Sequence, residues 1–183
     1  GGHAVLCVCG EGKVHASSAA TALVKDFGVK ALLNLGVAGA ASPSLGLYDV
    51  VAGDSAIQYD FDLSYVGDLR RGQLPGFDDE FIPLYDGYVK GFEKLGLRCG
   101  RLATIDTFRY NKENLEFLRR NNVLAEDMEI AAIAQVAEFM GVRVASVKSI
   151  SNAIAENGGD EFGASLFKAI DAYVRLLPDI VNV

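Results

Sequence analysis

Short apolar runs alternate with helical runs along the whole chain, and this alternation constrains the fold more than any other feature of the sequence. Apolar runs bounded by glycine or polar residues predict strands over residues 3–9, 29–36, 47–52, 56–63, 100–105 and 142–150. Helices are predicted over residues 15–27, 84–95, 112–121 and 160–177, and from 126 or 127 to about 140, with a loop at residues 70–79. Such alternation is typical of a three-layer α/β/α fold around a mixed or largely parallel sheet.

The size and composition of the chain indicate one globular domain over residues 1–183. Hydrophobic residues make up 50% of the sequence and charged residues 22%, which favours a buried core over a disordered chain. A net charge of −7 argues against a nucleic-acid partner or an anionic membrane surface. No apolar run is long enough to span a bilayer.

The cysteines and the paired acids predict no disulfide, metal or cofactor site. Cys7 and Cys9 are separated by one residue on a predicted strand, so their side chains point to opposite faces. Asp60 and Asp62 share one face of a predicted strand, but the sequence offers no histidine or further acid beside them. We therefore expect a reduced, cytoplasmic protein without a metal or a cofactor.

The turn at residues 10–13, Gly-Glu-Gly-Lys, follows the first predicted strand and invites comparison with a phosphate-binding loop. The comparison fails, because Cys7 stands where the first glycine of that motif belongs and Val14 replaces its serine or threonine. What remains is a tight strand-to-helix turn whose backbone can approach a small ligand.

Three acids and a methionine stand directly before an alanine-rich helical run at residues 125–134. Acids suit the positive end of the helix dipole, so Glu126 and Asp127 are candidates for capping the helix. In the alternative interpretation, the Glu129 carboxylate points into a pocket and holds a sugar hydroxyl. The spacing alone favours capping, because acids are preferred in a first helical turn.

Small or polar segments follow several of the predicted strands, at residues 36–40, 106–108 and 151–152. In α/β sheets, ligands gather at the carboxyl ends of the strands. The small residues at 36–40 allow the backbone to come close either to a ligand or to a neighbouring strand, and the sequence leaves both interpretations open.

Taken together, these segments resemble the nucleoside phosphorylases and nucleosidases of the purine-nucleoside-phosphorylase-like fold. The resemblance is greatest to the 5′-methylthioadenosine/S-adenosylhomocysteine nucleosidase family. The segments that carry it are residues 10–13, 34–40, 47–51, 72–76, 106–108, 127–129 and 149–152. It implies cleavage of the bond between ribose C1′ and a purine nitrogen through a sugar cation, as in glycoside hydrolysis.

The resemblance also implies roles for individual residues. Glu129 would hold the ribose hydroxyls and Asn152 would contact the N7 edge of the purine, which makes them the catalytic candidates. Phe108 would stack on the purine, with a place in the core as the alternative. The other substrate-binding positions that the resemblance implies are Glu11, Ala38, Gly39, Leu63, Val66, Pro75, Asp127, Met128 and Ser151. Of these, Leu63, Val66 and Pro75 would line the pocket for the 5′-substituent across a dimer interface.

Asn152 departs from the nucleosidases that act on adenine substrates, which carry aspartate at this position. An aspartic acid can protonate the leaving purine, whereas an amide only forms hydrogen bonds. An amide NH₂ suits the carbonyl oxygen of a 6-oxopurine, and asparagine here is similar to futalosine hydrolases and some inosine and guanosine phosphorylases. Adenine and a hypoxanthine-type base both stay open.

The beginning of the chain is a second departure. The family normally starts with a further strand and helix, and the end of that strand carries an acid that activates the attacking water. This sequence starts after that segment, at Gly1, without a methionine. Glu11 either supplies a carboxylate in its place or is a solvated turn acid. A complete chain of this kind would be weak or inactive, whereas a trimmed chain implies nothing about activity.

The segment at residues 36–39 bears on the nucleophile. The phosphorylases carry a phosphate-binding serine there and an arginine a few residues earlier, whereas this chain has Val37 preceded by Asn34 and Leu35. A valine side chain donates no hydrogen bond to phosphate, so hydrolysis is favoured over phosphorolysis. His3 and His15 are weaker candidates for a base.

Three hypotheses about function follow. The leading one is a hydrolase of a 5′-modified purine nucleoside, such as methylthioadenosine, S-adenosylhomocysteine or futalosine. The second is a phosphate-dependent phosphorylase that acts on 6-oxopurine nucleosides, and the third is a nucleoside-binding relative with impaired catalysis. The resemblance implies a homodimer, or a hexamer if the protein is phosphorylase-like.

Overall fold

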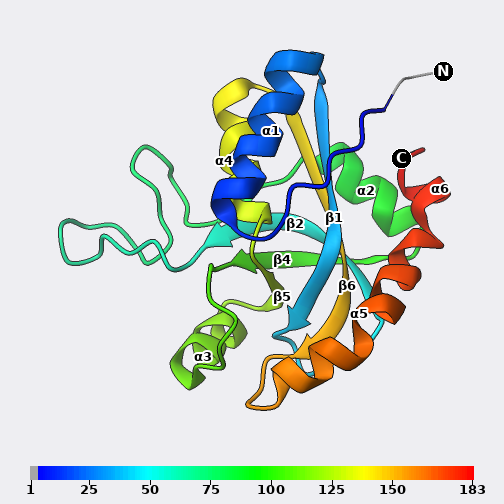
Figure 1. Cartoon of the computed structure of the whole chain (residues 1–183). Coiled ribbons are helices and arrows are strands. Elements are labelled where there is room, and N and C mark those ends of the chain that lie inside the picture. Colours follow the sequence, from blue (N-terminus) through cyan, green and yellow to red (C-terminus); the bar gives the residue numbers. More distant parts are fainter. Residues whose placement is uncertain (1–3) are drawn as a thin grey trace.

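A closed, mixed β-sheet forms the centre of the molecule (Figure 1). The computed structural model describes residues 4–183. The strands of the sheet are β1 (Ala31–Ala40), β2 (Val50–Gln58), β3 (Ile82–Pro83), β4 (Arg98–Thr104), β5 (Val123–Asp127) and β6 (Arg143–Ala153). They lie in the order β3-β2-β4-β5-β1-β6, and β6 also pairs with β2, which closes the sheet. Because β1 is parallel to β6 and antiparallel to β5, the predicted central mixed sheet is confirmed.

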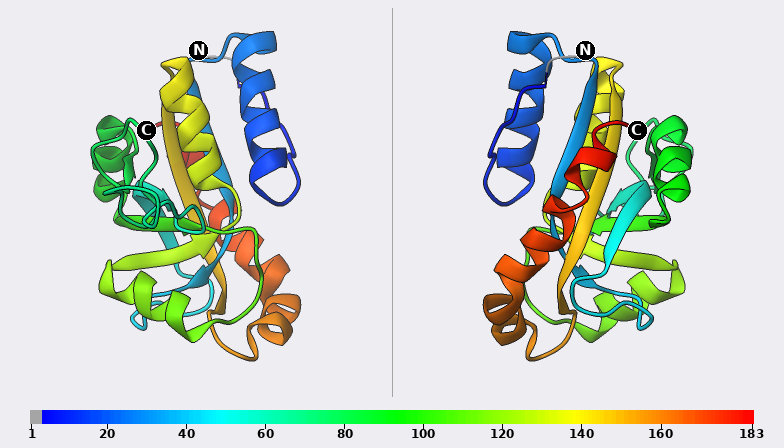
Figure 2. Two further views of the ribbon diagram at one scale, coloured as in Figure 1. Left: turned by 90° about the vertical axis from the view of Figure 1, so that its left-hand side faces the viewer. Right: turned by 90° about the vertical axis from the view of Figure 1, so that its right-hand side faces the viewer.

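Helices cover the outside of this sheet. They are α1 (Lys13–Phe27), α2 (Asp86–Lys94), α3 (Lys112–Arg120), α4 (Ile130–Met140), α5 (Gly158–Val174) and α6 (Leu177–Ile180). Both α4 and α5 pack against β1 and β6, from opposite sides, and α1 packs on α4 (Figures 1 and 2). None of the helices within residues 4–183 is long and apolar enough to cross a membrane.

Small side chains bring α1 close to α4. Ala16 and Ala20 are the buried residues of α1, and Ala134 and Ala137 are among the buried residues of α4. All four belong to one hydrophobic cluster. The short side chains allow the helices to approach closely, and this approach carries the beginning of α1 to the beginning of α4.

Residues 4–9 do not form the predicted buried strand. They have no regular secondary structure, and the side chains of Leu6 and Val8 are 89% and 92% exposed. An apolar run becomes a strand only where a neighbour offers backbone partners, and no strand of the sheet pairs with this segment. His3, the first residue of the predicted strand, lies outside the described residues.

The two strands predicted at residues 47–52 and 56–63 are one strand, β2. The sequence prediction left a break at residues 53–55, but β2 continues through it and absorbs the irregularity as a register shift against β4 between Gly53 and Ser55. Gly53 is needed there because a β-carbon would lie 2.8 Å from the side chains of both Leu84 and Leu102.

The region before α4 also differs from the prediction. Residues 123–127 form strand β5, and α4 begins only at Ile130, not at residue 126 or 127. Acids in front of an alanine-rich run suggested a helix start, but β5 pairs with β1 and β4 on its two sides and these partners override the local pattern. Near the end of the chain, the predicted helix at 160–177 is split into α5 and α6, with Pro178 in the first turn of α6.

Candidate active site

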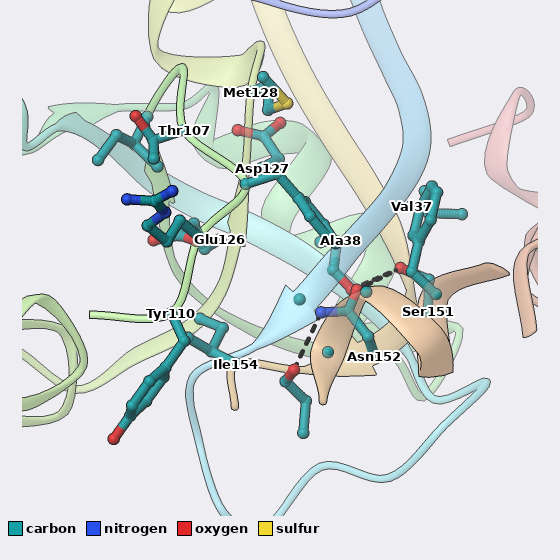
Figure 3. A pocket seen from close by; sticks show the side chains of 18 of the residues that line it. Val37, Ala38, Thr107, Tyr110, Glu126, Asp127, Met128, Ser151, Asn152 and Ile154 are labelled. Atoms are coloured by element: carbon teal, nitrogen blue, oxygen red, sulfur yellow. Dashed lines mark hydrogen bonds between the residues drawn. The ribbon is translucent and has the colours of Figure 1, made fainter. Parts of the chain in front are cut away.

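A cavity of about 490 Å³ opens at the ends of β1, β5 and β6 (Figure 3). The segment that follows β4 and the beginning of α5 complete its wall. The predicted site residues that line it are Glu11, Ala38, Gly39, Phe108, Asp127, Met128, Glu129, Ser151 and Asn152. Segments far apart in the sequence therefore meet at one place, as expected for a ligand site at strand ends.

Leu63, Val66 and Pro75 do not line this cavity. They lie in the long connection between β2 and β3, which projects from the sheet, and the side chain of Val66 is 82% exposed (Figure 1). The resemblance places these residues across a dimer interface, so their contact with a substrate in a partner's cavity stays a prediction.

Gly39 lies on the cavity floor between two polar side chains. In the sheet it pairs with Glu126 of β5 on one side and with Asn152 of β6 on the other. The register with β6 shifts just before Gly39, where Ser151 is the extra residue of a bulge. A β-carbon on Gly39 would stand 3.3 Å from Nδ2 of Asn152, so the glycine keeps the space between the two side chains open.

Lys148, which the sequence analysis missed, is buried beside two of the predicted acids. Its Nζ lies 2.8 Å from Oδ2 of Asp127 and 3.5 Å from Oε2 of Glu129. Burial lowers the pKa of Lys148, but the charges of the two carboxylates outweigh this effect and hold the pKa above its ordinary value. A β-carbon on Gly36 would lie 3.2 Å from Nζ, so this glycine makes room for the ammonium group. A lysine within the apolar run 142–150 was the available signal, because a buried lysine is nearly always paired.

The Asp127 side chain accepts the first N–H of α4, which is the kind of contact that the capping interpretation predicted, although Asp127 lies before the N-cap residue itself. The N–H of Ile130 donates to Oδ2 of Asp127 at 3.0 Å, and the hydroxyl of Thr104 donates to Oδ1 at 2.6 Å. Together with Lys148, these donors satisfy a carboxylate that is almost completely buried. For Glu126 the capping interpretation is wrong, because its carboxylate accepts a hydrogen bond from Tyr59 instead.

Glu129 joins the beginning of α4 to the beginning of α1. It is the N-cap residue of α4, and its Oε1 accepts a hydrogen bond of 3.1 Å from the N–H of Gly12. The next N–H of α1, that of Lys13, donates to Oδ1 of Asp106 at 3.0 Å. The positive end of α1 and the ammonium group of Lys148 both attract the charge of Glu129. Its side chain lines the cavity and is 15% exposed, and its contact with a sugar stays a prediction.

Neighbouring groups orient the amide of Asn152 (Figure 3). The hydroxyl of Ser151 donates to Oδ1 at 2.9 Å, and Nδ2 donates to the carbonyl oxygen of Ala153 at 3.0 Å. A carbonyl oxygen only accepts, so this contact identifies the NH₂ end of the amide. One N–H of that NH₂ group is left for a ligand, and Asn152 therefore offers the cavity a hydrogen-bond donor but no transferable proton.

Glu126 places a second carboxyl group in the cavity wall. The hydroxyl of Tyr59 donates to its Oε2. Burial raises the pKa of Glu126 to about 7, against the opposing effect of that hydrogen bond and with support from the charges of Asp127 and Asp60. Arg71 lies 5.1 Å from the centre of the Tyr59 ring and donates through Nε to the Tyr59 carbonyl oxygen at 2.8 Å. A carboxyl group with a perturbed pKa in a cavity is typical of a functional position.

Phe108 lies at the edge of the cavity and not in the core. Its side chain is 56% exposed, and its ring centre is 5.3 Å from that of Phe162 in α5. The core alternative for Phe108 is therefore wrong. Two aromatic rings at a cavity edge offer a surface for a flat, apolar ligand, and stacking on a purine stays a prediction.

Asp60 and Asp62 do not share a strand face, because β2 ends at Gln58. Asp60 instead forms an ion pair with Lys13 at the beginning of α1. Across residues 4–183, no group of three or more histidine, cysteine or acidic side chains is placed to hold a metal ion.

The chain and its fold belong to a known class of proteins. The family model of the phosphorylase superfamily matches residues 1–180, and the chain belongs to that superfamily. It is similar to the 5′-methylthioadenosine/S-adenosylhomocysteine nucleosidase of Anoxybacillus flavithermus, with 29% identity over 190 residues that cover 100% of this chain and 82% of that protein. The resemblance inferred from the sequence is thereby confirmed.

Two solved structures from Helicobacter pylori have a similar fold over nearly the whole length of this chain. One is 5′-methylthioadenosine/S-adenosylhomocysteine nucleosidase in complex with a substituted pyrrolidin-3-ol, with a TM-score of 0.89, 30% identity, and coverage of 95% of this chain and 77% of that chain. The other is futalosine hydrolase, with a TM-score of 0.89, 29% identity and the same coverage.

Proposed function

We propose that this protein hydrolyses the N-glycosidic bond of a purine nucleoside that is modified at its 5′ position. The observation that carries the proposal is the meeting of Glu129, Asn152 and Phe108 in one cavity. They provide a carboxylate for a sugar, a hydrogen-bond donor for a base and an aromatic surface for a ring. The similar proteins, named as 5′-methylthioadenosine/S-adenosylhomocysteine nucleosidases and as a futalosine hydrolase, support the same reaction class.

In the proposed reaction, the bond from ribose C1′ to the purine breaks while positive charge develops on the sugar. The Glu129 carboxylate binds the ribose hydroxyls and stabilises this charge, and the stabilisation is strengthened because the side chain itself is only 15% exposed. Met128 packs against the sugar, and the Phe108 ring holds the purine. Asn152 donates its free N–H to the departing purine as a hydrogen bond, which withdraws electron density from the breaking bond, and transfers no proton itself. Water forms the new bond to C1′, and the proton that this water loses goes to the departing purine.

Water is the better nucleophile for this cavity. The described acids that line it are Glu11, Glu126, Asp127, Glu129 and Glu156, whereas Arg109 is the basic residue of the same lining. The buried Lys148 is already paired with two carboxylates. A lining with such an excess of negative charge disfavours a phosphate ion, and Val37 in the cavity wall offers it no hydrogen bond.

A base-release assay tests the proposal. The protein is incubated with methylthioadenosine, inosine and futalosine, with and without phosphate, and free base is measured. We expect release without phosphate. Release only with phosphate would show a phosphorylase, and binding of nucleosides without release would show a relative with impaired catalysis. Glu129→Gln should slow release by about a hundredfold, while Glu138→Gln on the exposed side of α4 serves as the matched control.

We also propose a homodimer, in which the connection between β2 and β3 reaches the cavity of the partner. In support, this connection projects from the sheet and exposes Tyr65 and Val66 at 98% and 82% (Figure 1). Apolar side chains exposed together in this way are typical of an interaction surface. Sedimentation analysis of the wild-type protein and of a Val66→Asp variant tests this proposal. A wild-type protein that sediments as a monomer and still releases base would refute it.

A further inference from the structure

We propose that Glu126 recognises the purine base, accepting a hydrogen bond from the ring N–H of a 6-oxopurine whose carbonyl side is bound by the amide of Asn152. This inference rests on the proposed function, since it assumes that the cavity binds a purine nucleoside. It assigns a specificity-determining role to a residue that the sequence alone placed at a helix start.

The sheet register places the two residues on either side of the cavity floor (Figure 3). Glu126 and Asn152 both pair with Gly39, on strands that flank β1. Paired residues of neighbouring strands project to the same face, and two strand spacings put their α-carbons about 10 Å apart. Because Gly39 has no side chain, a flat ring can lie over it with one edge toward each polar group.

One oxygen of Glu126 is free to bind a ligand. Its Oε2 accepts the hydroxyl of Tyr59, whereas Oε1 has no hydrogen-bond partner within residues 4–183. The Tyr59 ring is held in turn by Arg71 and by a stack on Phe117, with the ring centres 5.8 Å apart. A carboxyl group that is fixed at one oxygen and open at the other is prepared to accept a hydrogen bond in one direction.

The donor and acceptor pattern of this pair selects a 6-oxopurine over an adenine. A 6-oxopurine carries a carbonyl acceptor at C6 and an N–H donor at the adjacent N1. The NH₂ of Asn152 complements the first and the carboxylate of Glu126 complements the second. In adenine both groups are reversed, so the amino group would meet the NH₂ of Asn152 and, above the Glu126 pKa of about 7, the unprotonated N1 would meet an ionised carboxylate. Such mismatches are strongly disfavoured because the protein group concerned, such as the buried Asn152, is left without a partner.

The local chemistry argues against a purely structural role for Glu126. A tyrosine hydroxyl needs only one acceptor, which a neutral amide or a backbone carbonyl provides at lower cost than a partly buried carboxylate. The acid also lies among other acids, with Asp127 next to it in the chain and Asp60 nearby. A ligand that donates an N–H group to the Glu126 carboxylate explains why an acid occupies this position among other acids.

The experiment is run at about pH 8, above the pKa of about 7 of Glu126, so that its carboxylate is mostly ionised. It compares two substrates that differ only in the base, 5′-methylthioinosine and 5′-methylthioadenosine. We expect the wild-type protein to prefer the inosine compound in kcat/KM. Glu126→Gln keeps the shape but weakens the acceptor, and Glu126→Leu removes it. We expect these variants to lose roughly ten- and a hundredfold in kcat/KM for the inosine compound, the range for hydrogen bonds to charged groups, and to change little for the adenosine compound. Glu138→Gln is the matched control.

The outcomes separate the two proposals. An equal loss on both substrates, or a wild-type preference for the adenosine compound, would overturn the role of Glu126 while leaving the hydrolase intact. If the wild-type protein releases no base from either compound, the proposed function fails. In that case the binding of free hypoxanthine and of free adenine is measured by calorimetry. Tighter binding of hypoxanthine that is lost in Glu126→Leu would still support the role of Glu126 in base recognition. Equal binding of the two bases would refute that role.

Discussion

The pH dependence of stability offers a direct test of the environment of Glu126. Burial raises the pKa of Glu126 from its ordinary value of 4.5 to about 7 in the folded protein. The folded state therefore holds this proton more tightly than the unfolded state does. The resulting stability is fully present below about pH 4.5 and is lost as the pH rises toward the folded pKa. Tyr59 donates a hydrogen bond to Glu126, and the nearby charges that act on it are those of Asp127 and Asp60.

The magnitude follows from the two pKa values. Each pH unit between them is worth about 1.4 kcal/mol, so complete ionisation of Glu126 in the folded protein costs on the order of 3 kcal/mol. Part of this cost is already present at about pH 5, which leaves about 2 to 3 kcal/mol to appear between about pH 5 and about pH 8. Glu126→Gln removes the titrating group and retains an acceptor for Tyr59. The free energy of unfolding of this variant should therefore lack the loss that ionisation of Glu126 causes in the wild-type protein.

Urea denaturation of the wild-type protein and the variant at both pH values measures the effect. All other titrating groups are common to the two proteins and cancel in the difference. We expect Glu126→Gln to gain about 2 to 3 kcal/mol relative to wild type on going from the lower to the higher pH. Glu138→Gln, an exposed change of the same type, should show no such gain. If the difference in free energy of unfolding between Glu126→Gln and the wild-type protein stays constant with pH, burial does not raise the pKa of Glu126 and the prediction is refuted.

Three further predictions concern the charged and polar groups of the cavity. Lys148→Met leaves two carboxylates without their buried partner and should lower the free energy of unfolding by about 3 to 5 kcal/mol in urea denaturation, whereas the exposed Lys168→Met should not. Glu129→Gln should lower kcat/KM for base release by about a hundredfold, the usual effect of losing one electrostatic contact to the transition state. Asn152→Asp supplies a proton donor and should shift base release toward adenine nucleosides; an unchanged preference would refute that role.

The positions of most cavity residues could be predicted because they follow strands and have side chains suited to ligands. Gly39 and Asn152 are of this kind, since a glycine-rich strand end and a polar pair after an apolar run are visible in the sequence. Strand β5 could not be predicted from its five residues, because its pairing with β1 and β4 outweighs its resemblance to a helix start. The surroundings of Glu126 could not be predicted for a similar reason, since its partner Tyr59 is 67 residues away.

The change from strand β5 to helix α4 places three neighbouring acids, Glu126, Asp127 and Glu129, in different surroundings. Asp127 faces the buried Lys148 and accepts hydrogen bonds from Thr104 and from the first N–H of α4, so little of its charge is left for a ligand. Glu126 precedes it on the strand and therefore points to the opposite face, where Tyr59 fixes one of its oxygens. Glu129 follows the end of the strand and reaches the cavity with Lys148 and the beginning of α1 beside it. Because each acid meets a different partner, one charge stabilises the fold while the other two stay directed at the cavity, toward the proposed sugar and base positions.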